Sequence, residues 1–467
     1  MKPALVVCLL CLPACLPAQV TPTSAQPTPA PTELLGQPFY VKAIWPIAGK
    51  GSWDFVKVDP AYRQLFIAHG NQVQAVNIET GLVDGVIHGT RNARAIALDD
   101  REDFGYISGG SANEVQAFDR RSLKIVARIP TGPNPRALVF EPATGLLFAV
   151  CNPSQQDPSK LTVMGISPNS TLPQDRADTI GFEAGSYADR KPDEYYVTTM
   201  AGKVLRTRPA KPPDPKAPPP ESIITVIDAE TWTPLAAIAL KGRAGFAEAD
   251  GQGRVFINMV DQNAIIRLEA QGIRDLLDEK RPITEEELKY GKNRYTAIPD
   301  GGGNPLAYQN PDIFQTLVSK ALVLDWRGTT QANRPPGGLW HFFSLGKECS
   351  EPQSLTIDGP HLRLFVACND SKLSVVNADT GQVVTKTPTG VGTGVVEFDS
   401  ARNLIYAANG SGTLTIIRQH VTDSYQVVQN LSTSRRARVL AVDPSTGEVY
   451  VVTDSGESGL AVLVVGH

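Results

Sequence analysis

The stretch "GSWDFVKVDPAYRQLFIAHGNQVQAVNIETG", residues 51–81, alternates apolar and polar side chains over three short runs and ends each run at a turn. Alternation with a period of two predicts β-strands that bury one face. The first two runs and the acidic turn between them recur six more times along the 467-residue chain. The stretch is therefore one copy of a repeat, and the repeat decides the fold.

An acidic residue opens the first turn of every copy. A carboxylate suits this position because it accepts hydrogen bonds from nearby backbone N–H groups. The column consists of Asp59, Asp99, Glu141, Asp250, Asp358, Asp399 and Asp443. Successive members are 40 to 44 residues apart except for two gaps of 109 and 108 residues, so each long gap holds one period and an insertion.

A third and a fourth strand follow the first two, as in "LSVVNADTGQVVTKT". Four short strands in a period near 42 residues are typical of a propeller blade. We therefore predict an all-β fold, a seven-bladed β-propeller with four-stranded antiparallel blades over residues 39–467. The last copy lacks a fourth strand, and "FYVKAIWPIAG" at residues 39–49 has that pattern, so an N-terminal strand is expected to close the ring.

The two insertions span about residues 152–222 and 270–320. The first is rich in proline and charge, contains the candidate strand "EYYVTTM", and is expected to leave blade three at the face where the inner strands begin, here called the top face. The second contains "TEEEL", which resembles a helix start. It leaves the bottom face if "AIIRLEA" is the third strand of blade four, and the top face if "ALVLDW" is.

Residues 1–18 have the pattern of an export signal, with one lysine and a short apolar run, and residues 19–38 form a Pro/Thr-rich linker. "LPAC" ends at Cys15 and resembles a bacterial lipobox, which makes Cys15 a candidate lipidation site; cleavage after Ala25 is the alternative. We expect an exported protein of the bacterial periplasm or cell envelope.

Three cysteines follow the signal: Cys151, Cys349 and Cys368. Cys349 precedes the first strand of blade five and Cys368 ends its second strand, so a disulfide between them is expected in an oxidising compartment. The alternative is that His69, Cys151 and Cys368 converge as soft metal ligands.

Composition excludes some functions. The net charge of −4 lacks the basic excess that duplex nucleic acid attracts. The chain contains no Gly-x-Ser-x-Gly, His-Glu-x-x-His or phosphate-binding glycine loop.

The residue that enters each inner strand and the residue that ends each second strand are expected to meet at the top mouth of the channel. The first set is Asp54, Arg94, Arg136, Phe246, Gln353, Gly394 and Arg438, and the second is His69, Gly109, Cys151, Met259, Cys368, Asn409 and Thr453. Three of the first seven are arginine, whose planar fork of donors suits carboxylate or phosphate groups. We predict a ligand site made of Trp53, Asp54, His69, Arg94, Arg136, Phe246, Gln353, Asn409 and Arg438. The alternative is that the arginines pair with Asp54, Glu351 and loop carbonyls and tie the blades together.

The repeats "LFIAHGNQVQAVNIETG", "LFVACNDSKLSVVNADTG" and "VYVVTD" resemble the YVTN repeat of bacterial exported seven-bladed propellers, the YncE-like family. "WD" at Trp53, "KECSEP" from Lys347 and "NGSGTLTII" from Asn409 resemble one subgroup of it. The resemblance implies the fold and export. It implies little about activity, because roles proposed for members differ, single-stranded DNA binding among them.

These observations favour a non-catalytic binding module, a monomer without a metal or cofactor, whose partner is a small anionic ligand, a glycan or an envelope protein. A metal-dependent hydrolase or lactonase that uses Asp54, Glu351, Asn258 and Asn409 is the alternative, which leaves enzymatic activity open. Single-stranded DNA binding is a further alternative.

Overall fold

The computed structural model describes residues 37–49, 53–152, 195–198, 204–207, 221–280, 282–283, 322–326, 338–421, 423–454 and 459–467. The predicted export signal, Cys15, most of the linker and the expected helix at "TEEEL" lie outside these ranges.

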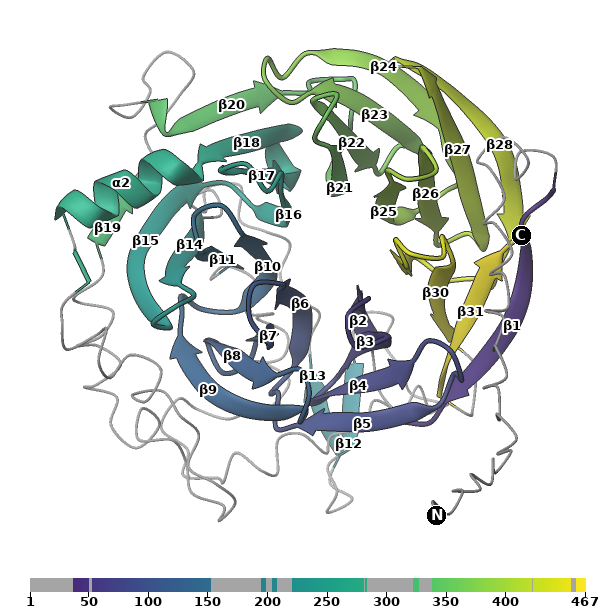
Figure 1. Cartoon of the computed structure of the whole chain (residues 1–467), viewed down its shortest axis with the longest axis horizontal. Coiled ribbons are helices and arrows are strands. Elements are labelled where there is room, and N and C mark those ends of the chain that lie inside the picture. Colours follow the sequence, from purple (N-terminus) through teal and green to yellow (C-terminus); the bar gives the residue numbers. More distant parts are fainter. Residues whose placement is uncertain are drawn as a thin grey trace, which may run out of the picture. The chain divides into compact units, whose positions relative to one another are not determined.

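Seven sheets surround a central axis, and each contains one four-stranded antiparallel blade (Figure 1). Blade one contains β2 (Trp53–Asp59), β3 (Gln64–His69), β4 (Gln72–Asn77) and β5 (Val83–His88). Blade two contains β6 (Ala93–Asp99), β7 (Phe104–Gly109), β8 (Glu114–Asp119) and β9 (Lys124–Pro130). Blade three contains β10 (Pro135–Glu141), β11 (Leu146–Cys151), β14 (Glu221–Asp228) and β15 (Thr233–Lys241). Blade four contains β16 (Ala244–Ala249), β17 (Arg254–Met259), β18 (Ala264–Glu269) and β20 (Trp340–Ser344). Blade five contains β21 (Pro352–Asp358), β22 (Arg363–Cys368), β23 (Lys372–Asn377) and β24 (Val383–Pro388). Blade six contains β25 (Thr393–Asp399), β26 (Leu404–Asn409), β27 (Thr413–Val421) and β28 (Ser424–Ser432).

Blade seven combines strands from the start and from the end of residues 38–467. β29 (Val439–Val442), β30 (Val449–Asp454) and β31 (Leu460–Gly466) form its inner three strands, and β1 (Tyr40–Ile47) pairs antiparallel with β31 as the outer strand. Figure 1 shows the purple β1 beside the yellow β31. The backbone N–H and C=O of Phe39 also exchange two 2.8 Å hydrogen bonds with the Gln429 side chain of blade six. The seven-bladed fold and its closure by an N-terminal strand are therefore as the repeat predicts.

Every acid of the repeat column accepts a backbone N–H of its own turn, which explains why each copy has one. The pairs are Ala61 to Asp59, Arg101 to Asp99, Thr144 to Glu141, Gln252 to Asp250, His361 to Asp358, Ala401 to Asp399 and Ser445 to Asp443. Some of these carboxylates also bind a cation from the next blade. Arg120 of blade two donates to both oxygens of Asp59 in blade one at 2.7 and 2.5 Å, and both side chains are almost fully buried.

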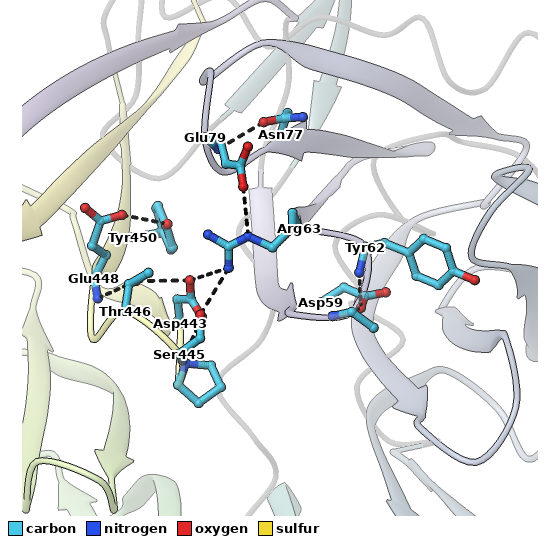
Figure 2. A network of polar contacts seen from close by, with 12 residues as sticks. Asp59, Tyr62, Arg63, Asn77, Glu79, Asp443, Ser445, Thr446, Glu448 and Tyr450 are labelled. Atoms are coloured by element: carbon cyan, nitrogen blue, oxygen red, sulfur yellow. Dashed lines mark hydrogen bonds and ion pairs between the residues drawn. The ribbon is translucent and has the colours of Figure 1, made fainter. Parts of the chain in front are cut away.

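An ion pair between an arginine and an acid of the repeat column also joins the first and last blades. Arg63, in the first turn of blade one, donates to Asp443 of blade seven at 2.7 Å and to Ser445 at 3.2 Å, and its Nε atom donates to Glu79 (Figure 2). Burial by itself would raise the pKa of the Asp443 carboxyl, but hydrogen bonds from Ser445 and Arg63 outweigh it and hold that pKa below its ordinary value. The carboxylate therefore stays charged where the ring closes.

The first insertion leaves blade three after its second strand, as expected, and includes the hairpin β12 (Tyr195–Thr198) and β13 (Val204–Thr207), which overlaps the predicted strand. The second leaves after β18, so "AIIRLEA" supplies the third strand of blade four and the bottom-face alternative holds. It begins with the helix α2 (Ala270–Lys280), whose first N–H binds Gly253 in a bottom turn. "ALVLDW" instead contains β19 (Leu322–Asp325), a fifth strand that runs parallel to β15 at the outer edge of blade three. Within the described ranges, no helix is long and apolar enough to cross a membrane.

We predict that Arg120→Gln lowers the free energy of unfolding by about 3 kcal/mol, because it leaves the buried Asp59 carboxylate without its cation. The matched control is Arg121→Gln. The Arg121 side chain follows Arg120 in the sequence, is mostly exposed and lies 3.5 Å from Asp103. The control should cost less than about 1 kcal/mol. Urea unfolding of both variants measures the difference, and equal costs would contradict a structural role for Arg120.

Candidate functional site

A cavity of about 1070 Å³ opens at the top face of the propeller. All seven residues predicted to enter the inner strands line it: Asp54, Arg94, Arg136, Phe246, Gln353, Gly394 and Arg438. They occupy one position of the repeat, and the ring brings the seven copies of that position together. Gly394 is required at its position because a Cβ atom there would lie 2.3 Å from the backbone oxygen of Arg438 in the next blade.

A β-bulge places these residues in six of the blades. The pairing of each inner strand with its neighbour shifts register at this point, between Trp53 and Val56 in blade one and at the matching places in blades two to six. A bulged residue leaves the regular ladder, so its side chain can be redirected. The bulges therefore turn one residue per blade toward the mouth.

Seven of the nine predicted site residues line the cavity, and two are not among its described lining residues. His69 is 3% exposed, and its Nδ1 atom lies 2.9 Å from the Gln74 amide oxygen. Asn409 is fully buried, accepts from Thr393 at 2.7 Å and donates to Thr415 at 2.9 Å. Both side chains hold their own blades together at the end of a second strand, which explains why they do not reach the mouth.

Two arginines that line the cavity were not among the predicted site residues. Arg243 lies one residue before β16, and Arg436 lies three residues before β29, where its guanidinium is 3.6 Å from Asp454. Both are in loops outside the aligned repeat. A search for arginine within three residues of each strand start would have found them.

Ion pairing divides the arginines of the mouth into two groups. Arg94 donates to Asp54 of the neighbouring blade at 3.0 Å, so this pair does tie two blades together. Arg243 and Arg438 have no carboxylate within ion-pair distance in the described part of the chain. Glu351, the other expected acidic partner, accepts instead from the Asn369 side chain at 2.9 Å.

Arg136 lies between like charges. Burial, followed by the positive charges of Arg94 and Arg243, lowers the pKa of the Arg136 guanidinium below its ordinary value, against the influence of Asp54. Mutual repulsion of like charges disfavours the charged forms. An anion in the cavity would relieve this repulsion.

Two aromatic rings form the floor of the cavity. Phe55 of blade one and Phe246 of blade four meet with their ring centroids 5.7 Å apart. Both residues also line a second cavity of about 320 Å³, together with Lys57 and Glu248. The aromatic pair therefore stands between the upper cavity and a lower chamber.

Lys57 of β2 and Glu248 of β16 line the lower chamber, and the charge of Glu397 on β25 acts on both of them. Burial raises the pKa of the Glu248 carboxyl to about 7; Lys57 opposes this rise and Glu397 adds to it. Burial also raises the pKa of Glu397, against Lys57. Burial alone would lower the pKa of Lys57, but the charges of Glu397, Glu248 and Asp100 together raise it.

The predicted disulfide between Cys349 and Cys368 is present, with its Cα atoms 5.2 Å apart. Cys368 therefore offers no thiolate to the soft-metal site considered with His69 and Cys151. Cys151 is buried, and burial raises the pKa of its thiol to about 12. Among the described residues, no group of three or more His, Cys, Asp and Glu side chains is placed to hold a metal ion.

The residues considered for a lactonase are separated. Asp54 and Glu351 line the upper cavity, whereas Asn258 and Asn409 are fully buried. The Asn258 amide has no hydrogen-bond partner among the described residues.

Neither a protein-family model nor a curated protein matches the chain. Its fold is similar to that in the crystal structure of the RRP9 WD40 repeats, with a TM-score of 0.52 and 8% identity over 92% of this chain and 97% of that one. It is also similar to the structure of U3-55K, with a TM-score of 0.51 and 7% identity over 91% of this chain and 98% of that one. At these identities the likeness shows the propeller fold alone. The YVTN-repeat resemblance stays a prediction.

We predict that Glu248→Gln stabilises the protein more at pH 8 than at pH 5. A carboxyl whose pKa is raised in the folded state binds its proton more tightly there, so folding loses stability as pH rises from about 4.5 to about 7. The variant, which has no charge to bury, should gain on the order of 2 kcal/mol relative to wild type across this range.

Thermal unfolding at the two pH values measures this effect. Glu230→Gln is the control, because the Glu230 side chain is exposed. A Glu248→Gln profile parallel to that of wild type would show that Glu248 titrates normally.

Proposed function

We propose that this propeller is a non-catalytic binding module that holds an anionic ligand in the upper cavity. The observation that carries the proposal is the convergence of Arg94, Arg136, Arg243, Arg436 and Arg438 on one cavity. Three of them come from consecutive blades. These five guanidiniums outnumber the three carboxylates that line the same cavity, those of Asp54, Glu351 and Asp454, and a net positive charge in a concave site attracts an anion.

The arrangement suits recognition by hydrogen bonds. Guanidinium groups can bind a carboxylate or phosphate through two parallel N–H donors. The rigid ring holds them in place before the ligand arrives, which lowers the entropic cost of binding.

We predict that the double variant Arg136→Gln/Arg243→Gln binds citrate and inorganic phosphate at least about tenfold more weakly than wild type, since each lost charged hydrogen bond is worth about 1.5 kcal/mol or more. Its melting temperature should stay within about 2 °C. Isothermal titration calorimetry at low salt measures binding, and Arg121→Gln, which removes a charge from an outer turn, is the control.

Two results would contradict this assignment. Unchanged anion affinity in the double variant would place any anion elsewhere, and a collapsed melting temperature would make these arginines structural. The other functions have their own readouts: turnover of lactones that a chelator abolishes would indicate a hydrolase, and salt-sensitive binding of a single-stranded oligonucleotide would indicate a nucleic-acid-binding protein.

The location proposed for this module is the bacterial cell envelope. The apolar run before Cys15, the lipobox-like "LPAC" and the resemblance to exported YVTN-repeat propellers support it. We predict that wild type expressed in a bacterium is recovered with the membranes, and that Cys15→Ala moves it to the periplasmic fraction. Recovery of both forms in the cytoplasm would contradict export.

A further inference from the structure

We propose that the ligand of the upper cavity is an acidic oligosaccharide, a chain of sugar acids with carboxylates at intervals and hydroxyl groups between them. This inference rests on the proposed function, because it assumes that the cavity binds an anion. It adds that the ligand carries more than one anionic group and that hydroxyl groups lie between these groups.

The cationic groups lie on opposite sides of the mouth. Arg136 and Arg243 belong to blades three and four, and Arg438 belongs to blade seven. In a ring of seven, blade seven is three steps from both of the others, so it faces them across the axis. Figure 1 shows β10 and β16 on the side of the ring away from β30. A chain that carries carboxylates at intervals can therefore pair with guanidiniums on both sides of the mouth at once.

Acidic side chains lie between the two cationic sides. Asp54 belongs to blade one and Glu351 directly precedes blade five, and both are exposed in the cavity. A chain that carries only negative charge would be repelled by them. A hydroxyl group can donate a hydrogen bond to each carboxylate, so a ligand with both acid and hydroxyl groups fits the mixed charges.

Amide side chains extend this pattern. Gln353 and Asn369 line the same part of the cavity and are exposed, and an amide both donates and accepts hydrogen bonds. Sugar hydroxyl groups have the same dual capacity. The polar residues between the arginines therefore match hydroxyls better than further anions.

The floor and walls suit sugar rings. Phe55 and Phe246 form the floor, and Trp53 also lines the cavity; all three are partly exposed. Aromatic faces bury the apolar C–H surface of a ligand and hold it in one orientation. The cavity of about 1070 Å³ lies just above the range for small-ligand pockets, about 300 to 1,000 Å³, so it has room for more than one sugar unit.

The test uses galacturonic acid, its trimer and neutral maltotriose, titrated into the full chain by calorimetry at low salt. The trimer should bind at least about tenfold more tightly than the monomer, because its second carboxylate reaches the opposite side. Maltotriose should not bind measurably. Arg438→Gln should remove most of the trimer's advantage and change monomer affinity less than about threefold.

Matched variants identify the two sides. Arg243→Gln should weaken both monomer and trimer, and Arg121→Gln, far from the cavity, should change neither. Melting curves of all three variants should overlay that of wild type, which separates binding from folding.

The outcomes separate this inference from the proposed function. If monomer and trimer bind equally, the cavity holds one anion and the oligosaccharide assignment is wrong, although anion binding stands. If tetra-aspartate binds more tightly than the trimer, the ligand is an acidic peptide instead. If citrate, phosphate and both uronates all fail to bind, the proposed function itself is overturned.

Discussion

Closure of the ring by β1 and β31 is the constraint on which the rest of the structure depends. Each blade packs between two neighbours, so one open junction would expose two apolar faces and two strand edges. The ladder between these strands completes blade seven, the hydrogen bonds of Gln429 tie Phe39 to blade six, and the Arg63–Asp443 ion pair joins blade one to blade seven. The seven strand starts surround one cavity only when this junction is closed.

Arginine has two roles in this chain, and its surroundings distinguish them. At the bottom face Arg120 is buried and donates to both oxygens of Asp59, so the Asp59 carboxylate neutralises its charge within the fold. At the top face Arg243 and Arg438 have no such carboxylate partner among the described residues, and Arg136 is held beside other guanidiniums. Buried ion pairs thus join blades at the bottom face, whereas the mouth has both paired arginines, such as Arg94, and arginines without a carboxylate partner among the described residues.

The period, the acidic column and the missing fourth strand were enough to predict the blades and their closure, because each feature reflects a local requirement repeated seven times. The positions that begin the inner strands were predictable for the same reason. His69 and Asn409 were misplaced because the alternation that describes a strand does not show which hydrogen bonds its last side chain makes. The parallel pairing of β19 with β15 was not predicted, since the paired residues, such as Ala236 and Leu322, are 86 positions apart and nothing local specifies that pairing.

The bulges at the strand starts have an evolutionary consequence. Residues such as Arg136 and Gln353 are the extra residues of their bulges, outside the ladder pairing that sets the register of the blade. Their identity can change while the scaffold keeps its shape, so related propellers are free to acquire new ligand preferences by single substitutions. Gly394 and the Arg94–Asp54 pair are the exceptions, because at those positions the same residues also hold neighbouring blades in place.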